Sequence, residues 1–354
     1  MGADARWTGA VVLRGDVLVP AGRRLVVAAG ADVSCASEPA RSTPPPRPAF
    51  AGLVHGGLRP SARLIVEGEL VVSGSAEAPA RFGGEFWGGI WAAGRGRIAL
   101  RHAALAGMER AVVAVDFARA VVSDCSISGN DAGAAIGGCA RALFRRCRFE
   151  RSGEIGALAA DDANVLLSFC GLESSLTGAA AEGCARLRLR GCSARGCAGS
   201  GLRASGASSV SARESRFNDC AVAAAAQGRS ELKLASCRAT GGRTAWEAFG
   251  DARLDLRRCE GFGQETGLWV QDRAAAVCDE GRFEGGWFGL RASHRSRLTA
   301  RATQTEVLVA ALVEGDAFAS FRGCEGVAAR GGPDLLGRAA ADVDGVRFRP
   351  PFMK

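Results

Sequence analysis

The sequence contains no tyrosine and almost no lysine. Of its 45 cationic residues only Lys233 and Lys354 are lysine, and histidine occurs three times in 354 residues. This bias is typical of a GC-rich genome, so a high arginine count is weak evidence for a binding function. The net charge of +8 is modest for this length and does not indicate a nucleic-acid-binding protein.

Long apolar runs are missing as well. No stretch approaches the 18 or more apolar residues that a membrane-spanning helix needs. Arg14, Asp16, Arg23 and Arg24 interrupt the first thirty residues, so these contain no continuous signal-peptide core. We therefore expect no membrane span and a cytoplasmic location for the chain as written. A mature fragment of an exported or envelope-associated protein, recloned behind a new Met, would look the same.

Helix periodicity is also missing, and the 49 glycines are too many for a helical protein. Instead, a sequence pattern of about 22 residues is repeated from Arg97 to about Cys324. A fixed period of this size indicates a stacked repeat. The repeats start at Arg97, Arg119, Arg141, Asn164, Arg186, Ser209, Glu231, Arg253, Ala275, Arg297 and Phe318.

The residues within each repeat alternate as in a β-strand. The second and fourth positions are apolar and the residues between them are mostly polar. A second strand follows in each repeat, for example at 267–270 and 289–292. Two or three short strands per repeat, stacked about 4.8 Å apart, predict an all-β parallel β-helix.

The seventh position of the repeat is always small and is often cysteine. We interpret it as an inward cysteine ladder at a corner where only a small side chain fits, with a metal site as the less economical alternative. Stacked Cβ vectors run in parallel and suit a disulfide poorly, so we expect mostly free thiols. Cys197 and Cys220 are the next-best pair, whereas Cys139 and Cys184 lie two repeats apart and should not bridge. The ladder residues are Cys125, Cys147, Cys170, Cys192, Cys237, Cys259 and Cys324.

The length and the repeat predict one elongated domain over residues 1–354. Residues 1–34 form a cap with the first strands, and residues 36–60 hold six of the eleven prolines and form a surface loop inserted before the repeats. Residues 61–330 are the repeated coils. Residues 331–354 break the repeat with proline and bulky side chains and are expected to cap the other open end.

Three short segments precede the regular repeats. They are Gly-Asp-Val-Leu-Val-Pro-Ala-Gly at 15–22, Leu-Ile-Val-Glu-Gly-Glu-Leu at 64–70 and Trp-Gly-Gly-Ile at 87–90. Their order, followed by repeats of this length, resembles the right-handed parallel β-helix repeat proteins of the pectin-lyase-like superfold. The resemblance covers essentially the whole chain and implies a right-handed, single-stranded solenoid with capped ends, commonly associated with polysaccharide or the cell envelope.

That superfold hosts lyases, hydrolases, esterases, epimerases, tailspikes and non-catalytic modules, so the fold does not select a reaction. Its lyases typically use acidic residues for calcium and an arginine or lysine as base, while glycoside hydrolases pair two carboxylates roughly 5 to 9.5 Å apart. The acids of this chain are scattered. The adjacent pair Asp161 and Asp162 lies at a coil-ending turn, where aspartate favours the turn itself.

The three histidines are far apart in the repeat and do not form a metal set. They are His55 in the proline-rich loop, His102 in the first repeat and His294 near a late turn. We therefore predict no catalytic residues, no metal and no cofactor, although a site under the 36–60 loop, near His55, stays open.

One outward position on the second strand suggests a sugar platform. Trp269 lies between inward Leu268 and Val270, and a tryptophan beside arginine and glutamate can stack on a pyranose while the charges bond its hydroxyls. The alternative is a cation–π stack with Arg291 that closes the surface against water. Trp246 falls on the inward phase and is expected in the core. The candidate ligand-binding residues are Trp269, Arg291, Glu247, Arg203 and Trp287.

Outward apolar residues on the first strand form a candidate partner patch. Val121, Leu143 and Leu166 occupy the third position of three consecutive repeats, with Phe169 close by. Stacked apolar residues at the surface suggest a partner, or cover by the chain's own loop 36–60 or its C-terminal tail.

Arginine recurs at the fifth position of the repeat. Such a row could hold acidic polysaccharide or nucleic acid, but it lacks interleaved aromatics, so a solvated face is favoured. The row consists of Arg101, Arg145, Arg190, Arg213, Arg257, Arg301 and Arg322.

The sequence therefore favours a non-catalytic structural or binding β-helix that presents its lateral faces to a glycan or to protein partners. The alternative is a polysaccharide-active enzyme, a lyase or a hydrolase. Nucleic acid is not an expected partner, and the pattern does not predict an oligomeric state.

Overall fold

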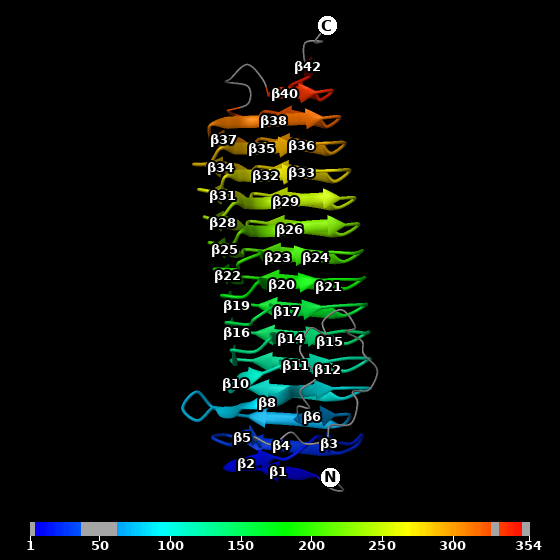
Figure 1. The fold of residues 1–354 in the computed structure, drawn as a ribbon, viewed down its shortest axis with the longest axis vertical. Coiled ribbons are helices and arrows are strands. Elements are labelled where there is room, and N and C mark those ends of the chain that lie inside the picture. The colour runs from blue at the N-terminus through cyan, green and yellow to red at the C-terminus, as the bar shows by residue number, and fades with distance from the viewer. Residues whose placement is uncertain (1–3, 37–61, 327–332, 349–354) are drawn as a thin grey trace. The chain divides into compact units, whose positions relative to one another are not determined.

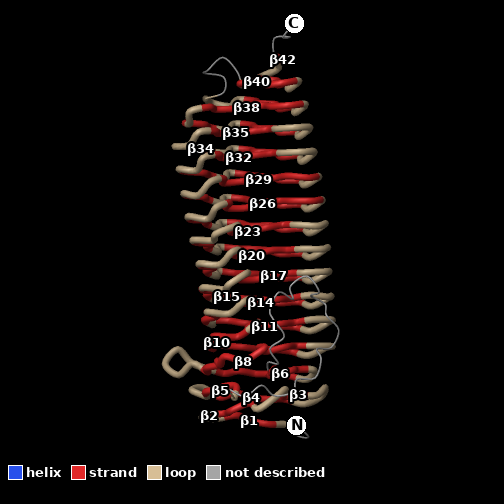
Figure 2. Tube along the Cα trace, in the orientation of Figure 1, coloured by secondary structure: helices blue, strands red, loops and turns tan. Residues whose placement is uncertain are grey.

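The computed structural model describes residues 4–36, 62–326 and 333–348, and every regular element in these residues is a β-strand (Figures 1 and 2). The chain divides into two compact units, residues 1–187 and 188–354. In each unit, strands of successive coils pair in parallel and in register. This confirms the predicted all-β class and the parallel β-helix with coils of about 22 residues. The single domain and its two caps stay predictions, and residues 37–60 of the proline-rich loop, His55 included, lie outside the described residues.

Most coils contain three strands, where the sequence left two or three open. In most coils the first strand has five residues, the second has three, and the third has five to seven. The second strand was not foreseen because three residues are too short for visible alternation. The strand that the sequence identified as second is therefore the third strand of the coil.

The strands of the first unit follow this order. Its first strands are β1 (Ala5–Trp7), β4 (Arg24–Ala28), β7 (Glu69–Ser73), β9 (Arg97–Arg101), β12 (Arg119–Ser123), β15 (Arg141–Arg145) and β18 (Asn164–Ser168). Its second strands are β2 (Ala10–Leu13), β5 (Asp32–Cys35), β10 (Ala103–Met108), β13 (Ser126–Ser128), β16 (Arg148–Glu150) and β19 (Gly171–Glu173). Its third strands are β3 (Val17–Val19), β6 (Ala62–Val66), β11 (Arg110–Ala114), β14 (Ala132–Ile136), β17 (Ile155–Ala159) and β20 (Thr177–Ala181), and the long β8 (Ala80–Ala92) serves as second and third strand together.

The second unit repeats the plan. Its first strands are β21 (Arg186–Arg190), whose first two residues belong to the first unit, β24 (Ser209–Arg213), β27 (Glu231–Ala235), β30 (Arg253–Arg257), β33 (Ala275–Asp279), β36 (Arg297–Arg301), β39 (Phe318–Arg322) and β41 (Ala340–Val343). Strand β42 (Val346–Phe348) pairs with β41 in the antiparallel sense. Its second strands are β22 (Ser193–Arg195), β25 (Arg216–Asn218), β28 (Arg238–Thr240), β31 (Glu260–Phe262), β34 (Arg282–Glu284) and β37 (Gln304–Glu306). Its third strands are β23 (Ser200–Ala204), β26 (Val222–Gly228), β29 (Thr244–Gly250), β32 (Thr266–Val270), β35 (Phe288–Ala292), β38 (Val309–Gly315) and β40 (Asp334–Gly337).

The core of each unit is the inside of the coil. The second and fourth residues of the first strands point inward, as Ala142 and Phe144 do in β15, and both are buried. Phe144 packs edge to face on Phe149 of the second strand, with ring centroids 5.5 Å apart. Because the register is kept from coil to coil, like side chains stack above one another and bury apolar surface along the whole interior.

Aspartates at one turn of the coil connect neighbouring coils. Asp161 has a left-handed backbone (φ 57°), and its Oδ2 accepts a hydrogen bond of 2.9 Å from the Gly138 amide of the neighbouring coil. Asp116 makes the same bond to Gly94, also at 2.9 Å. Aspartate tolerates the left-handed conformation, and its carboxylate accepts a hydrogen bond from a backbone amide that would otherwise lack a partner in the turn. The geometry fits the turn interpretation of Asp161.

The first unit also has a buried apolar cluster on the outward side of its third strands, which the sequence did not predict. Val113, Ala135, Leu158 and Ala180 follow one another in register, and each is at most 2% exposed. Next to them Trp91 contacts two arginine guanidinium groups, with centroid distances of 5.7 Å to Arg63 and 5.9 Å to Arg110.

Within the described residues the protein has no helix that is long and apolar enough to cross a membrane.

Candidate functional site

The predicted sugar-platform residues lie in one outward row on the third strands of the second unit. Glu247 pairs with Trp269 and Trp269 with Arg291 in adjacent strands. Arg203 occupies the same row, with Ala225 between it and Glu247. The register predicted for the row is therefore present, whereas its role in ligand binding stays a prediction.

Trp269 is half-buried, and Arg291 covers its ring. The Arg291 guanidinium carbon lies 4.7 Å from the ring centroid, and Arg291 Nε donates a 2.8 Å hydrogen bond to Glu314 Oε2. A ring covered in this way does not offer that face to a sugar. The contact is the cation–π stack considered as the alternative, and Trp246 is fully buried as predicted.

Glu247 and Trp287 differ in their surroundings. Glu247 is half-buried and accepts a 2.8 Å hydrogen bond from Gln271 Nε2. Burial raises the pKa of the Glu247 carboxyl, although the charge of Arg243 and the hydrogen bond from Gln271 oppose the shift. Trp287 is 66% exposed, just before strand β35. The row thus contains one carboxyl group, that of Glu247, whose raised pKa favours its protonated form.

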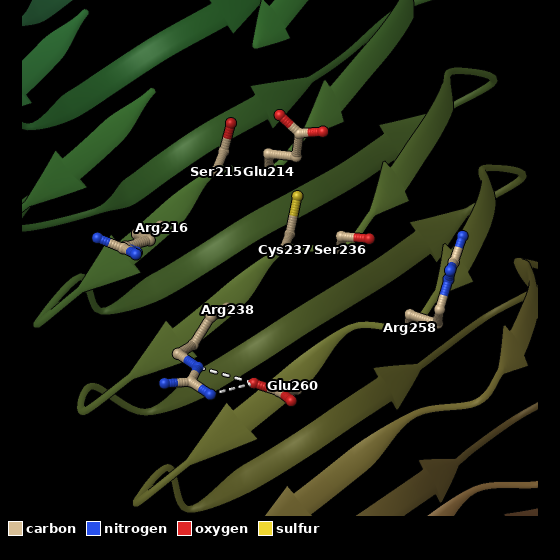
Figure 3. Close-up of a pocket in the computed structure, with 8 residues that line it drawn as sticks. All are labelled: Glu214, Ser215, Arg216, Ser236, Cys237, Arg238, Arg258 and Glu260. Carbon is tan, nitrogen blue, oxygen red and sulfur yellow. Dashed lines mark hydrogen bonds and ion pairs between the residues drawn. The ribbon is translucent and has the colours of Figure 1, made fainter. Parts of the chain in front are cut away.

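A second arrangement, which the sequence did not single out, is a groove of about 500 Å³ in the second unit. It follows the corner between the first and second strands over three consecutive coils, as Figure 3 shows. Its lining residues are Glu214, Ser215, Arg216, Ser236, Cys237, Arg238, Arg258 and Glu260.

The corner places these side chains in two rows. Glu214, Ser236 and Arg258 are the sixth residues of their repeats and have left-handed backbones with φ of 51 to 52°. The eighth-position residues Arg216, Arg238 and Glu260 begin the second strands and follow one another in register. The two rows therefore stand on either side of the seventh-position row that contains Ser215 and Cys237 (Figure 3).

The groove contains three arginines and two glutamates, so it is cationic. Arg238 Nη2 lies 2.6 Å from Glu260 Oε2, which neutralises that pair. Arg216 and Arg258 are exposed and form no ion pair with any residue that the structure describes. The sequence contained a weak signal for this site, because fifth-position arginines such as Arg213 border it, but the sixth and eighth positions vary too much to show a row.

None of the thirteen cysteines forms a disulfide, and the seven ladder residues are buried. The Cys147 thiol hydrogen-bonds to the sulfur of Cys125, which raises the pKa of Cys147 to about 12 and lowers that of Cys125. Burial raises the pKa of Cys278 to about 12. A protonated, buried thiol is a poor nucleophile and metal ligand. The burial of all seven ladder thiols and the raised pKa of Cys147 favour the packing interpretation, which stays a prediction. Hydrogen bonds lower the pKa values of Cys125 and Cys237, and Cys278 lies outside the ladder.

Thiol labelling tests that interpretation. Only Cys139 and Cys184 are exposed and Cys35 is half-buried, so we expect two thiols to react rapidly with a disulfide reagent in the native protein and Cys35 to react more slowly. The ten buried thiols should react when the chain is unfolded. The absorbance of the chromophore that the reagent releases, followed with time, measures how many thiols have reacted. Rapid reaction of the ladder cysteines would contradict the packing interpretation.

No three histidine, cysteine, aspartate or glutamate residues gather at metal-ligand distances within the described part of the chain. His294 Nδ1 lies 3.6 Å from Asp272 Oδ1 at an exposed turn. His102 has a left-handed backbone (φ 48°) at a corner of the first unit. These two histidines therefore occupy separate turns.

The predicted partner patch is brought together in the first unit. Val121 pairs with Leu143 and Leu143 with Leu166 in adjacent strands, so their side chains stack on one face. Val121 is 49% exposed, Leu166 37% and Phe169 55%, while Leu143 is half-buried. Its role as a partner site stays a prediction.

Comparison with known proteins agrees with this architecture. A family model described as the right handed beta helix region matches residues 110–299, which is more than half of the chain. Among solved structures, the chain is similar to the alginate lyase from Paenibacillus sp. str. FPU-7, with a TM-score of 0.40 and 10% sequence identity over 94% of this chain and 98% of the lyase. No curated protein sequence matches the chain. Since the family match covers most of the repeats, the chain belongs to the right-handed β-helix family.

Proposed function

We propose that this protein is a non-catalytic binding β-helix that holds a linear acidic glycan in the corner groove of its second unit. The observation that supports the proposal best is the pair of exposed arginines, Arg216 and Arg258, which have no acidic partner among the described residues and line a groove of about 500 Å³. Carboxylate or sulfate groups of a glycan would supply the missing charge.

The chemistry of the groove suits such a ligand. The guanidinium group presents a planar set of donors that matches a carboxylate or sulfate with two parallel hydrogen bonds. Arg216 and Arg258 lie two coils apart, about 10 Å along the stack of strands, so they can contact two charged groups of an extended polymer. The corners belong to paired strands, which hold the arginine backbones in place before the ligand arrives.

Binding measurements with defined glycans test this function. Calorimetry at low salt with polygalacturonate, heparin and neutral dextran should show binding of at least one acidic glycan and none of dextran. The double variant Arg216→Ala, Arg258→Ala should weaken binding about tenfold or more, which is a loss of about 1.4 kcal/mol or more. Arg253→Ala, Arg297→Ala is the matched control, because both residues are exposed arginines on first strands away from the groove. Equal losses in both double variants, or no binding of either acidic glycan, would disprove the proposal.

A second candidate function is hydrolysis or elimination of a polysaccharide at the Trp269 row. Glu247 supports it, because burial raises the pKa of its carboxyl and such a group can serve as a general acid. If this function is correct, the protein incubated with a glycan panel and calcium should produce new reducing or unsaturated ends, and Glu247→Gln should abolish them. Absence of new ends with the wild-type protein would rule the activity out for those substrates.

A further inference from the structure

The first-strand face of the first unit carries an apolar stripe. The middle residues of consecutive strands β7, β9, β12, β15 and β18 pair in register and point outward. Three of them, Ala99, Val121 and Leu166, are exposed, and Val71 and Leu143 are half-buried. The stripe comprises Val71, Ala99, Val121, Leu143 and Leu166. Exposed apolar residues in adjoining coils form one continuous surface, which in a folded protein marks an interaction site.

Arginines border the stripe on both sides. Arg97, Arg119 and Arg141 are the first residues of β9, β12 and β15, and Arg101 and Arg145 are the fifth residues of β9 and β15. All five are exposed, and none forms an ion pair with a residue in the described part of the chain. The face is therefore apolar along its centre, and five arginines border it on β9, β12 and β15. The other first and fifth residues of the five strands of the stripe are Glu69, Ser73, Ser123, Asn164 and Ser168.

The corresponding face of the second unit is different. Its middle residues include Ser211, Lys233 and Asp255, which are polar. Some of its charges pair within the chain, Lys233 with Glu231 at 2.8 Å and Arg257 with Asp255 at 3.4 Å. The first-position arginines Arg253 and Arg297 are exposed and form no ion pair with a described residue. The middle position of the first strands is therefore largely polar in the second unit and apolar in the first.

Phe169 adds an independent observation at the edge of the stripe. It is 55% exposed and has a left-handed backbone with φ 55°. A bulky residue in this region is a conformational outlier that costs on the order of 1 kcal/mol or more. Other corners of this row in the same unit hold Asp124 and Arg146, which form a bidentate ion pair. The strained, exposed ring of Phe169 makes no comparable contact with the described residues and is typical of a residue kept for an interface.

We propose that this stripe binds an acidic protein segment, namely one with a central ridge of apolar side chains bordered by aspartate or glutamate. Such a segment would bury the stripe and pair the arginines, which are favoured at interfaces because their guanidinium groups are weakly hydrated. A second copy of this face is disfavoured, because it would bring five arginines against five arginines. A nucleic acid would pair the arginines but would leave the apolar stripe without a partner.

A random-peptide phage library provides the probe. Panning on the wild-type protein, with counter-selection on the variant Leu143→Glu, should enrich peptides rich in aspartate or glutamate and in large apolar residues. Synthetic copies of these peptides should bind Leu143→Glu, and also Arg119→Glu, Arg141→Glu, about tenfold more weakly than the wild type. Val277→Glu is the matched control, because Val277 occupies the same outward strand position in the second unit and should leave binding unchanged. Circular dichroism and thermal unfolding establish that each variant is folded.

The outcomes separate this inference from its alternatives. Enrichment without an excess of acidic residues, no enrichment at all, or equal binding to Leu143→Glu would overturn it. So would dimerisation of the wild type that Leu143→Glu abolishes, or tighter binding of a duplex DNA than of the selected peptides. Peptides that bind only after residues 37–61 are replaced by a short Gly-Ser linker would show that the chain itself occupies the stripe. Because the groove variants Arg216→Ala and Arg258→Ala lie in the other unit, failure of the glycan proposal does not affect this result.

Discussion

The substitution Gly89→Ala is expected to lower the melting temperature by about 10 °C. Gly89 has φ +103°, and a Cβ atom there would lie 1.6 Å from the carbonyl oxygen of Arg110 and 2.8 Å from its carbonyl carbon. Backbone strain of about 1–3 kcal/mol and a forced shift of the neighbouring strand, about 1–3 kcal/mol, act together. For a unit of this size, each kcal/mol of lost stability lowers the melting temperature by about 2–4 °C. Thermal unfolding followed by circular dichroism measures the melting temperature.

The control for this prediction is Gly94→Ala. Gly94 also has a left-handed backbone (φ +62°), but a Cβ atom there would meet no atom within 4 Å. The alanine should therefore cost about 1 kcal/mol, the strain alone. Equal melting temperatures for the two variants would contradict the assignment of the larger loss to close contact with β11.

The close approach of the Gly89 backbone to strand β11 explains why the segment at 87–90 is Trp-Gly-Gly-Ile. Trp87 Nε1 donates a 3.1 Å hydrogen bond to the Gly89 carbonyl, and Trp91 Nε1 donates one of 2.9 Å to the Gly88 carbonyl. The two indoles thus hold a strand segment that approaches its neighbour too closely for any side chain. The sequence resemblance singled out this segment, and its physical reason is the backbone approach in strand β8.

The substitution Trp246→Ala should destabilise the second unit by about 3–5 kcal/mol, the usual range for removing a large aromatic side chain from a core. Trp246 is 0% exposed, and its ring packs edge to face on Phe217 at 5.9 Å. The alanine would leave a cavity between rigid sheets that cannot collapse to fill it. Urea unfolding followed by tryptophan fluorescence and circular dichroism measures the change.

Two further variants separate the cavity from other effects. Trp246→Phe keeps an aromatic ring and removes an indole nitrogen that has no hydrogen-bond partner among the described residues, so it should cost less than about 1.5 kcal/mol. Trp269→Ala removes a half-buried ring together with its Arg291 contact and should cost about 1–2 kcal/mol. A loss for Trp269→Ala as large as that for Trp246→Ala would show that the Trp269 row is structural rather than a surface available to ligands.

The candidate sites differ in how far the sequence could predict them. The Trp269 row and the Val121, Leu143 and Leu166 stack were predictable, because residues at equal positions of successive repeats must meet when strands pair in register. The arginine groove was not, because its residues occupy the sixth and eighth positions and become neighbours only when the chain turns at Glu214, Ser236 and Arg258. The corner depends on the backbone dihedral angles of these residues. The alternation of apolar and polar residues along a strand carries no information about those angles.

The sequence by itself determined the period, the inward positions of the first strand and hence the parallel β-helix, because a repeat that cannot bury its apolar face alone must stack on its neighbours. It also determined the Trp269 row and the stack of Val121, Leu143 and Leu166, to which the structure adds Val71 and Ala99. The tertiary structure decided what these rows can do. It placed the Arg291 guanidinium over the Trp269 ring, and it left Arg216, Arg258 and the arginines beside the stripe without acidic partners in the described residues. Charge neutralisation and ring coverage depend on side-chain distances between coils, and a one-dimensional pattern contains no such distances.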